Sequence, residues 1–293
     1  MTYQPVNAFD AFAIRVDSLE PPLVMTQPMG ARFADHRGLI EMPALMVLFD
    51  DLGGIPFSFA DRSSSSLQAR LSVSVGPRPG LTDVLRGESV LSMSDEAFGS
   101  TTVRVTRGDD EEVAGGRARS ARVGRARIGE SEIVVGPTLP APDDAELPEP
   151  IDQSLTGAQI VASIADGERR IGPLGELLGA SIADADPAAV RLAIPAAKWM
   201  GNFFGTMHGG MIATIVAQAA SLGVAANLRA GVGYQLVEFT VAFLRSPAVD
   251  GRSVTATAIP VKIGRRLSTV DVELHDADGI LLARATADAR CDV

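Results

Sequence analysis

A run of glycines and polar residues around one histidine precedes a long uncharged segment: Gly201-Asn-Phe-Phe-Gly-Thr-Met-His-Gly-Gly-Met-Ile-Ala-Thr-Ile215. No Asp, Glu, Lys or Arg occurs from Trp199 to Leu228, and we predict a buried helix over Met211–Leu222. The first amides of a helix lack intrahelical acceptors, and the helix dipole adds partial positive charge there. Glycines at 209 and 210 would let a carbonyl approach these amides and its oxyanion be stabilised. The alternative interpretation is a glycine-rich turn that only caps a core helix.

Two adjacent acids, Asp50 and Asp51, lie inside an otherwise apolar segment, Ala44–Gly53. Neighbouring carboxylates are costly to bury in such a segment, so a purpose is expected for them. A carboxylate held near a carbonyl can activate water as a general base or attack directly as a nucleophile.

The elements that must position these residues repeat along the chain. A shift of 167 residues places Val190–Pro195 over Leu23–Pro28, His208 over Glu41, and Ala217 over Asp50. In each copy a short strand precedes a loop, then an apolar helix, then alternating strands. The expected later strands are Leu67–Val75, Val90–Ser94, Thr101–Thr106 and Val113–Ala121 in the first copy, and Leu236–Leu244, Ser253–Val261, Ser268–His275 and Ile280–Ala287 in the second. One helix against a mostly antiparallel sheet is an α+β arrangement.

The segment between the copies is rich in proline and acidic residues, Pro137 to Pro150, so it reads as an extended linker. We therefore expect a degenerate N-terminal domain (1–136) that supplies the carboxylate, a linker (137–155), and a C-terminal domain (156–293) that carries the glycine-histidine motif.

The motif resembles the Asn-x-x-Gly-x-x-His-Gly-Gly pattern of hotdog thioesterases related to phenylacetyl-CoA thioesterase. Asn202, Gly205, His208, Gly209 and Gly210 match it, and the segments Phe243-Leu-Arg-Ser-Pro247 and Gly264-Arg-Arg266 are also similar to that family. The resemblance covers most of 175–293 strongly and 20–125 weakly. It implies two tandem hotdog folds packed as a pseudo-dimer and hydrolysis of acyl-CoA thioesters.

The chain departs from the family where a carboxylate is expected, nine residues after the histidine, because Ala217 and then Gln218 stand there. Nine residues along a helix span roughly 13 Å, so a histidine cannot share a reacting carbon with the acid of its own helix. In the family, each site lies between two hotdog units. We therefore expect one composite site, with Asp50 facing the motif of the other half, and an inert mirror-related site with Glu41 and Ala217.

The expected roles follow from this pairing. The Gly210 N–H polarises the carbonyl, Asn202 and His208 position the thioester or water, and Asp50 is the base or the nucleophile. Asp51 is interpreted as a cap or structural partner, although a one-residue slip would exchange it with Asp50. Gly209, Arg265 and Arg266 are expected to bind substrate. For the two arginines the reason is that guanidinium groups suit the phosphates of CoA. A second candidate for phosphate binding is an arginine run whose alternative is exposed strand positions: Arg117, Arg119, Arg122, Arg125 and Arg127.

Composition limits the other possibilities. A net charge of −10 disfavours nucleic acid as a partner, and the single cysteine, Cys291, excludes an internal disulfide or multi-cysteine metal site. No cofactor, metal or signal peptide is expected, the uncharged segment is interpreted as a buried helix instead of a membrane span, and a cytoplasmic dimer of double hotdogs is the expected state. An acyl-CoA-binding or regulatory protein without turnover is the main functional alternative, and enoyl-CoA hydration is a third.

Overall fold

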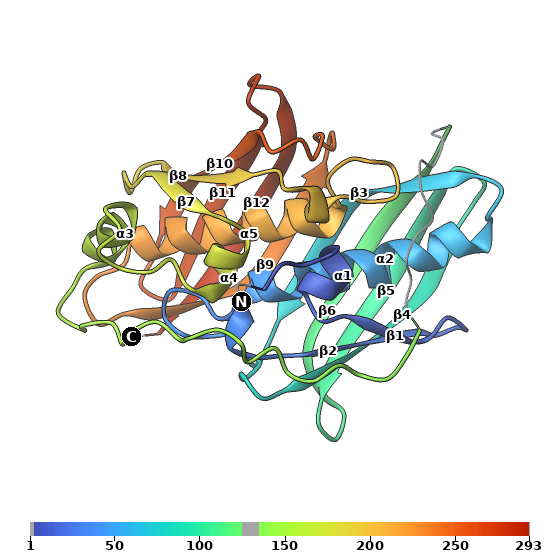
Figure 1. Ribbon diagram of the computed structural model, residues 1–293, viewed down its shortest axis with the longest axis horizontal. Helices are drawn as coiled ribbons and strands as arrows, with labels where there is room; N and C mark the ends of the chain where they lie inside the picture. Colours follow the sequence, from blue (N-terminus) through green and yellow to red (C-terminus); the bar gives the residue numbers. More distant parts are fainter. Residues whose placement is uncertain (1–2, 125–134, 293) are drawn as a thin grey trace.

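A single antiparallel sheet of twelve strands organises the computed structural model, which describes residues 3–124 and 135–292 (Figure 1). The strand order is β1-β2-β4-β5-β6-β3-β9-β12-β11-β10-β8-β7. The strands of the first half are β1 (Arg15–Ser18), β2 (Leu23–Pro28), β3 (Ser65–Val75), β4 (Val84–Ser94), β5 (Phe98–Arg107) and β6 (Glu111–Val123). Those of the second half are β7 (Ser181–Asp184), β8 (Val190–Pro195), β9 (Gly233–Phe243), β10 (Ser253–Ile263), β11 (Leu267–His275) and β12 (Leu281–Asp292).

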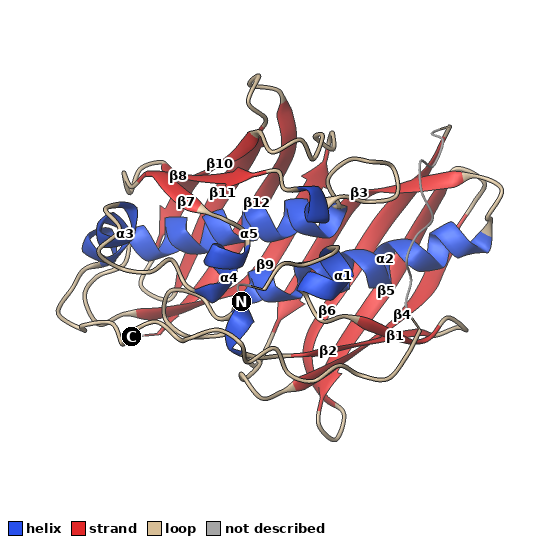
Figure 2. Ribbon diagram, viewed as in Figure 1, coloured by secondary structure: helices blue, strands red, loops and turns tan. Residues whose placement is uncertain are grey.

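Two long helices lie on the same face of this sheet and pack against each other (Figure 2). Helix α2 (Met46–Ala60) continues from the 3-10 turn η2 (Met42–Leu45), and α5 (Gly209–Ala226) begins directly after its N-cap, His208. Both helices are apolar on nearly all sides, and each is accordingly surrounded by the sheet, the other helix and the covering segments. The shorter helical elements are α1 (Ala8–Ala11), η1 (Ala31–Phe33), α3 (Gly157–Ala165), α4 (Pro173–Leu177) and η3 (Lys198–Met200).

The uncharged segment is a core helix, as the sequence predicts. Within the described residues, Met42–Ala60 and Gly209–Ala226 are long and apolar enough to cross a membrane, yet 72% and 94% of their windows are buried inside the protein. Burial of this extent is what two central helices of one hydrophobic core require.

The two halves repeat each other, which confirms two tandem hotdog folds packed as a pseudo-dimer. Strand β8 follows β2 by the predicted 167 residues, and each half has one long helix and six strands in the same order. The halves join where β3 pairs with β9 in antiparallel register, with Ser72 opposite Thr240. The bounds of β3 and β9 are 168 residues apart, which makes Ser72 and Thr240 equivalent, and their hydroxyls lie 3.1 Å apart. The pseudo-two-fold axis therefore passes through this pair, and the two sheets become one.

The predicted strands all exist, but most are longer than their apolar patterns. The largest difference is β4, which begins at Val84 and not at Val90. Its first residues pair with β5 and β2, so ladder hydrogen bonds extend the strand beyond the alternating segment.

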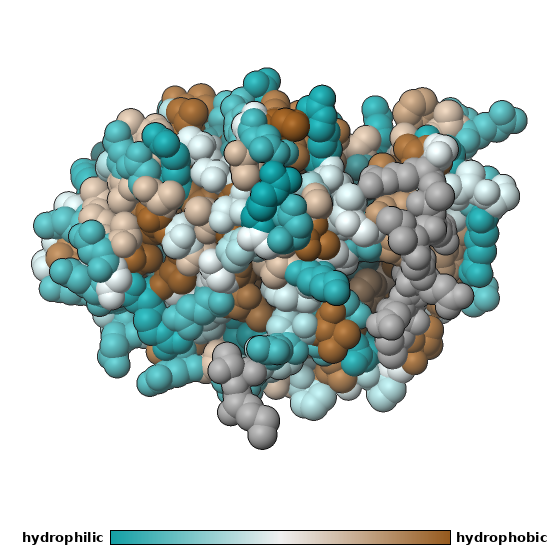
Figure 3. Space-filling view, turned by 45° about the horizontal axis from the view of Figure 1, so that its top comes forward, coloured by the Kyte–Doolittle hydropathy of each residue, from teal (hydrophilic) through white to brown (hydrophobic). Residues whose placement is uncertain are grey.

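Residues 137–155, the predicted linker, form no helix or named strand and contact both halves; Arg170 Nη1, for example, donates to the Glu146 carbonyl at 3.0 Å. Arg32 forms an ion pair with Asp144 at 2.9 Å, and its backbone N–H donates to the Pro142 carbonyl at 3.1 Å. The linker ends at Thr156, whose side chain forms a capping box with Gln159 at the start of α3. On the face shown in Figure 3, apolar side chains occur in separate patches among hydrophilic ones, as is usual on a globular protein.

Candidate active site

Asp50 of α2 meets the glycine-histidine motif of the other half at the N-terminus of α5. The backbone N–H of Gly210 donates to Asp50 Oδ2 at 2.7 Å, across 160 residues of chain. Asp50 Oδ2 also lies 3.2 Å from His208 Nδ1. The structure therefore brings Asp50, His208 and Gly210 together, in the pairing that the sequence predicts.

The two glycines permit this approach because α2 passes directly over the start of α5. A Cβ atom on Gly210 would lie 2.6 Å from the Cα atom of Val47, a backbone contact that could not be relieved by a rotamer change. A Cβ atom on Gly209 would lie 2.7 Å from Asp50 Oδ1. Glycine is thus required here for close contact between the halves, and not for an unusual backbone conformation.

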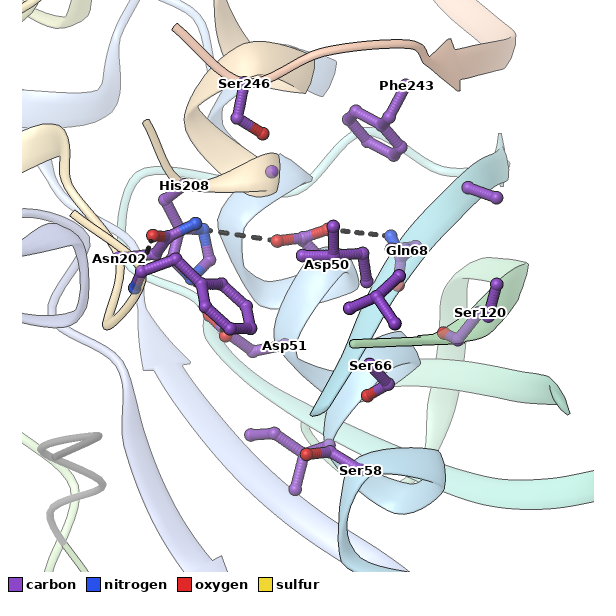
Figure 4. A pocket seen from close by; sticks show the side chains of 18 of the residues that line it. Asp50, Asp51, Ser58, Ser66, Gln68, Ser120, Asn202, His208, Phe243 and Ser246 are labelled. Atoms are coloured by element: carbon purple, nitrogen blue, oxygen red, sulfur yellow. Dashed lines mark hydrogen bonds and ion pairs between the residues drawn. The ribbon is translucent and has the colours of Figure 1, made fainter. Parts of the chain in front are cut away.

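Gln68 of β3 completes the surroundings of Asp50. Its Nε2 donates to Asp50 Oδ1 at 2.7 Å (Figure 4), so each carboxylate oxygen receives one N–H donor. Sequence reasoning missed Gln68, because a single glutamine in an alternating strand carries no signal of its own. Only the pairing of β3 with the helix layer shows that it faces the acid.

The backbone amide that remains available to a substrate belongs to Gly209, and this corrects the prediction for Gly210. The Gly210 N–H is directed at Asp50 Oδ2 and at His208 Nδ1, which lies 3.1 Å away. For the Gly209 N–H, the first of α5, no acceptor is found among the described residues. Gly209 also lines the cavity, whereas Gly210 is buried behind it. The Gly209 N–H is therefore placed to receive an oxyanion.

Asn202 shapes the loop that precedes His208. Its Oδ1 accepts hydrogen bonds from the backbone N–H groups of Phe204 at 2.9 Å and Thr206 at 3.3 Å. Gly205 lies within this loop at φ +72°, in the left-handed region that favours glycine. Asn202 lines the cavity as well, so its side chain both fixes the loop and borders the space where a substrate would bind.

The surroundings of the site shift the pKa values of its two main ionisable groups, Asp50 and His208. Burial raises the pKa of Asp50 to about 6; the His208 charge opposes this rise and the Asp51 charge adds to it. Burial lowers the pKa of His208, but the charges of Asp51 and Asp50 and a hydrogen bond to Asp51 outweigh it and raise that pKa to about 9. Near neutral pH the site therefore holds an imidazolium beside a carboxylate that can accept a proton.

The cavity beside Asp50 has a volume of about 620 Å³ and is lined by both halves. Figure 4 shows Asp50 between His208 and Gln68, with Phe243 and Ser246 on one side and Ser58 and Ser66 on the other. The charged residues in its lining are Asp50, Asp51, His208 and Arg245. Space on both sides of the acid would suit a substrate that extends in two directions from its reacting carbon.

Arg265 and Arg266 lie at the other end of the sheet from this cavity, which corrects their predicted place in the working site. They are in the turn between β10 and β11, where Arg266 O accepts from the Cys291 N–H, and Cys291 pairs with Tyr234. The cavity instead borders Phe243, nine residues along β9 from Tyr234, or roughly 30 Å at strand spacing. Arg245, which is exposed, is the arginine that lines the cavity.

The described residues of the second arginine run fit the alternative interpretation, exposed positions on a strand. Arg117 and Arg119 are exposed on β6 and alternate with the buried Ala118 and Ser120. Arg122 donates to backbone carbonyls near the end of α2. Arg125 and Arg127 lie outside the described residues.

The mirror-related site is filled by ion pairs. Glu41 Oε2 lies 2.7 Å from Arg37 Nη2 and 3.3 Å from Arg78 Nη2, and its Oε1 accepts from the backbone of Leu236 at 3.2 Å. Ala217, at the position equivalent to Asp50, is fully buried and offers no acid. This arrangement fits the inert site that the sequence predicts.

Asp50, Asp51 and His208 place one potential ligand atom each within 4.8 Å of one another, a separation that a divalent cation could span. Both ring nitrogens of His208 are already engaged, one toward Asp50 and Gly210 and the other toward Asp51. We therefore interpret the cluster as an ion-pair network and not as a metal centre.

Comparison with known proteins agrees with the tandem hotdog architecture. The chain matches, over essentially its full length, a hot dog fold protein of unknown function from Alicyclobacillus acidocaldarius, with 100% of this chain and 99% of that one covered, a TM-score of 0.62 and 14% identity. It also matches acyl-CoA thioesterase II TesB2 from Mycobacterium marinum, with 97% of each chain covered, a TM-score of 0.58 and 10% identity.

Sequence comparison gives matches to part of the chain. Residues 204–283 match the sequence model of the thioesterase superfamily. A Deinococcus radiodurans protein named "Putative esterase" is 34% identical over 100 residues, which are 34% of this chain. The matched region spans 65% of the length of that relative. The chain is thus a double hotdog, and residues 204–283 of its second half are similar to the thioesterase superfamily.

Proposed function

We propose that this protein hydrolyses acyl-CoA thioesters at one composite active site, releasing the free acid and CoA. The observation that carries the proposal is the 2.7 Å hydrogen bond from Gly210 of one half to Asp50 of the other, at the wall of a cavity. It joins a proton-accepting carboxylate to a helix N-terminus with an available amide. The thioesterase-superfamily match of residues 204–283 supports thioester hydrolysis as the chemistry.

In the first form of the mechanism, Asp50 acts as a general base. The thioester carbonyl oxygen receives the Gly209 N–H, and Asp50 removes a proton from a water molecule as that water attacks the carbonyl carbon. The carbonyl electron pair moves to oxygen, where the helix N-terminus stabilises it. When the carbonyl forms again, the carbon–sulfur bond breaks and the proton held by Asp50 passes to sulfur. A pKa of about 6 suits both proton transfers near neutral pH.

In the second form, an Asp50 oxygen attacks the thioester carbonyl and expels the CoA thiolate, and water then hydrolyses the resulting anhydride. The two forms predict different products in a single turnover in ¹⁸O-labelled water. A nucleophilic Asp50 acquires the label after the anhydride is hydrolysed at its own carbonyl, whereas a general base leaves the protein unlabelled.

Substrate placement follows from the cavity. Arg245 lines it from an exposed position, where its guanidinium could bind a phosphate of CoA while the thioester lies at Asp50. Acyl-CoA as the substrate class is supported by this arginine and by the similarity of the fold to an acyl-CoA thioesterase II. A cytoplasmic location and assembly into a dimer of double hotdogs stay predictions.

The experiment is a measurement of free thiol release from a panel of acyl-CoAs by the full chain. Wild-type protein should turn over at least one substrate, and Asp50→Asn should abolish the release while preserving the fold. Asp61→Asn is the matched control, because Asp61 follows the same helix but is exposed and does not line the cavity. Saturable binding of acyl-CoA without thiol release would identify the protein as the non-catalytic binding module, and no binding would refute both functions.

A further inference from the structure

Asp51 makes a contact with His208 that the proposed reaction does not yet use. Asp51 Oδ1 lies 3.2 Å from His208 Nε2, and the residue is 7% exposed. Asp50 and Asp51 are adjacent on α2, so their side chains diverge by about 100° around the helix axis. They reach the imidazole from two directions, one at each ring nitrogen.

This two-sided contact fixes the orientation of the ring. With Nε2 bound to Asp51, the Nδ1 edge must face Asp50 Oδ2 at 3.2 Å and the Gly210 amide at 3.1 Å. Without the Asp51 carboxylate, the Nε2–H would lose its acceptor in a site where the His208 side chain is only 15% exposed. A buried donor without an acceptor is unfavourable, so the ring would then be free to turn.

The mirror-related site shows that this acid is not needed to build the fold. Gln218 occupies the equivalent position on α5, and Glu41 occupies the position of His208. Gln218 is 1% exposed, and neither of its amide atoms has a hydrogen-bond partner in the described part of the chain. The second carboxylate is therefore present in the half that faces the histidine and absent from the half that does not.

A buried carboxylate with one unused oxygen also requires an explanation. Asp51 Oδ2 is buried and has no hydrogen-bond partner among the described residues, although Asp51 lines the cavity. Such an atom is costly unless the opposite charge of a neighbour compensates for it. His208 is the cation within reach that can do so.

We propose that Asp51 is a positioning residue that holds His208 as an imidazolium with its Nδ1 edge toward Asp50. This role rests on the proposed thioesterase function, because the purpose of the fixed imidazolium is to orient the working carboxylate. The effect of Asp51 on turnover is indirect and passes through His208.

The electrostatics of the cavity agree with this role. The ionisable groups that face His208 from α2 are Asp50 and Asp51; the loop before α5, β3 and β6 contribute uncharged residues to the cavity lining, and Arg245 follows β9 at an exposed position. Burial alone lowers the pKa of His208. The largest contribution that raises this pKa, to about 9, comes from Asp51. Removing the Asp51 charge should therefore bring the His208 pKa down.

The test is a histidine NMR titration of the full chain, which is simple because the protein has three histidines. His208→Gln assigns the His208 signals. In wild type, His208 should remain protonated up to about pH 9. In Asp51→Asn the midpoint should fall by about one to three pH units, the usual effect of losing an opposite charge at this distance. Asp51→Glu should restore part of the shift, and Asp61→Asn should leave it unchanged.

Turnover gives the second readout. Asp51→Asn should lower kcat at least about 10-fold with little change in KM, and the alkaline limb of the kcat profile should move to lower pH with the His208 midpoint. A His208 pKa near 6.5 or below in wild type would overturn the proposal without any variant. An unchanged His208 midpoint in a folded Asp51→Asn protein would also overturn it. Absence of thiol release by wild type would instead refute the thioesterase function, and the NMR result would still decide the Asp51–His208 pairing.

Discussion

Glu41 and His208 occupy equivalent positions 167 residues apart, and each is the N-cap of the helical segment that enters the core of its half. The Glu41 side chain accepts from the next backbone amide, Met42 N–H, whereas His208 Nδ1 lies 3.1 Å from the Gly210 nitrogen and 3.2 Å from Asp50 Oδ2. The same local geometry thus supports an ion-pair network in one half and a candidate reaction centre in the other. The chain retains the two-fold architecture of a pair of hotdogs, and the two equivalent positions differ in the side chains that they present.

The first prediction concerns this asymmetry. Asp50→Asn and His208→Ala should each lower kcat at least about 100-fold, because they remove the proton acceptor and the group that faces it. Glu41→Ala should leave the kcat of folded protein nearly unchanged. It should, however, lower the free energy of unfolding by about 3 kcal/mol, since Arg37 and Arg78 lose their buried partner. Steady-state kinetics and denaturant unfolding of the three variants check this. Loss of activity in folded Glu41→Ala with retention in Asp50→Asn would place the reaction at the mirror-related site.

The second prediction is a bell-shaped pH dependence of kcat/KM. Asp50 must be deprotonated to accept a proton, so activity should fall as pH drops below its pKa of about 6. His208 should be protonated in the working form, so activity should fall as pH rises above about 9. The acidic limb should persist in Asp51→Asn, because Asp50 is still present. A flat profile from pH 5 to pH 10 would contradict both assignments.

The tandem fold and the pairing of Asp50 with the motif of the other half were expected from the sequence, because duplication leaves a nearly constant shift between equivalent residues and the motif resembles that of hotdog thioesterases. That shift matches Asp50 with Ala217 and His208 with Glu41. Helix geometry separates a histidine from the acid of its own helix, and the family resemblance implies a site between two hotdog units. The contacts inside the site were not predictable in the same way. Whether Gly209 or Gly210 faces the cavity depends on how α2 crosses the start of α5, and no local pattern encodes that crossing.

The placement of Arg265 and Arg266 failed for a related reason. In the sequence they follow the motif of the working half, and in the structure β10 and β11 carry their turn to the opposite end of the sheet. The turn that carries Arg265 and Arg266 therefore lies at the mirror-related end, whereas Gln68 and Asp51 of the other half border the acid and the histidine.

The third prediction separates the two glycines. Gly209→Ala should lower kcat at least about 100-fold with a modest change in stability, because the added Cβ meets the Asp50 carboxylate and disturbs the available amide. Gly210→Ala should instead destabilise the protein by about 1–3 kcal/mol, because its Cβ meets the backbone of α2 at Val47. Paired measurements of kcat and of unfolding free energy test this. The reverse order of effects would return the oxyanion role to Gly210.

The fourth prediction concerns phosphate recognition. Arg245→Ala should raise the KM for acyl-CoA more than it lowers kcat, because the phosphates lie away from the reacting carbon. Arg265→Ala and Arg266→Ala are the matched controls and should change neither value, since both residues lie at the other end of the sheet. The Arg245 defect should disappear with a pantetheine thioester that lacks the phosphates. Equal impairment on both substrates would assign Arg245 a structural role.

The last prediction tests whether the site needs both halves. A fragment of residues 156–293 begins at the capping box of α3 and contains Asn202, His208 and both glycines, but it has Ala217 where an acid is needed. Its self-dimer would place His208 against Ala217 of the second copy, so it should release no thiol even if soluble.

Adding residues 1–140 should restore some hydrolysis, and the same fragment carrying Asp50→Asn should not. Ala217→Asp in the isolated second half could instead create two symmetric sites, at a cost of about 1–3 kcal/mol or more, because Ala217 is fully buried and its surroundings are packed for a methyl group. Hydrolysis by the unmodified fragment at the full-length rate would locate the base within residues 156–293 and remove Asp50 from the mechanism.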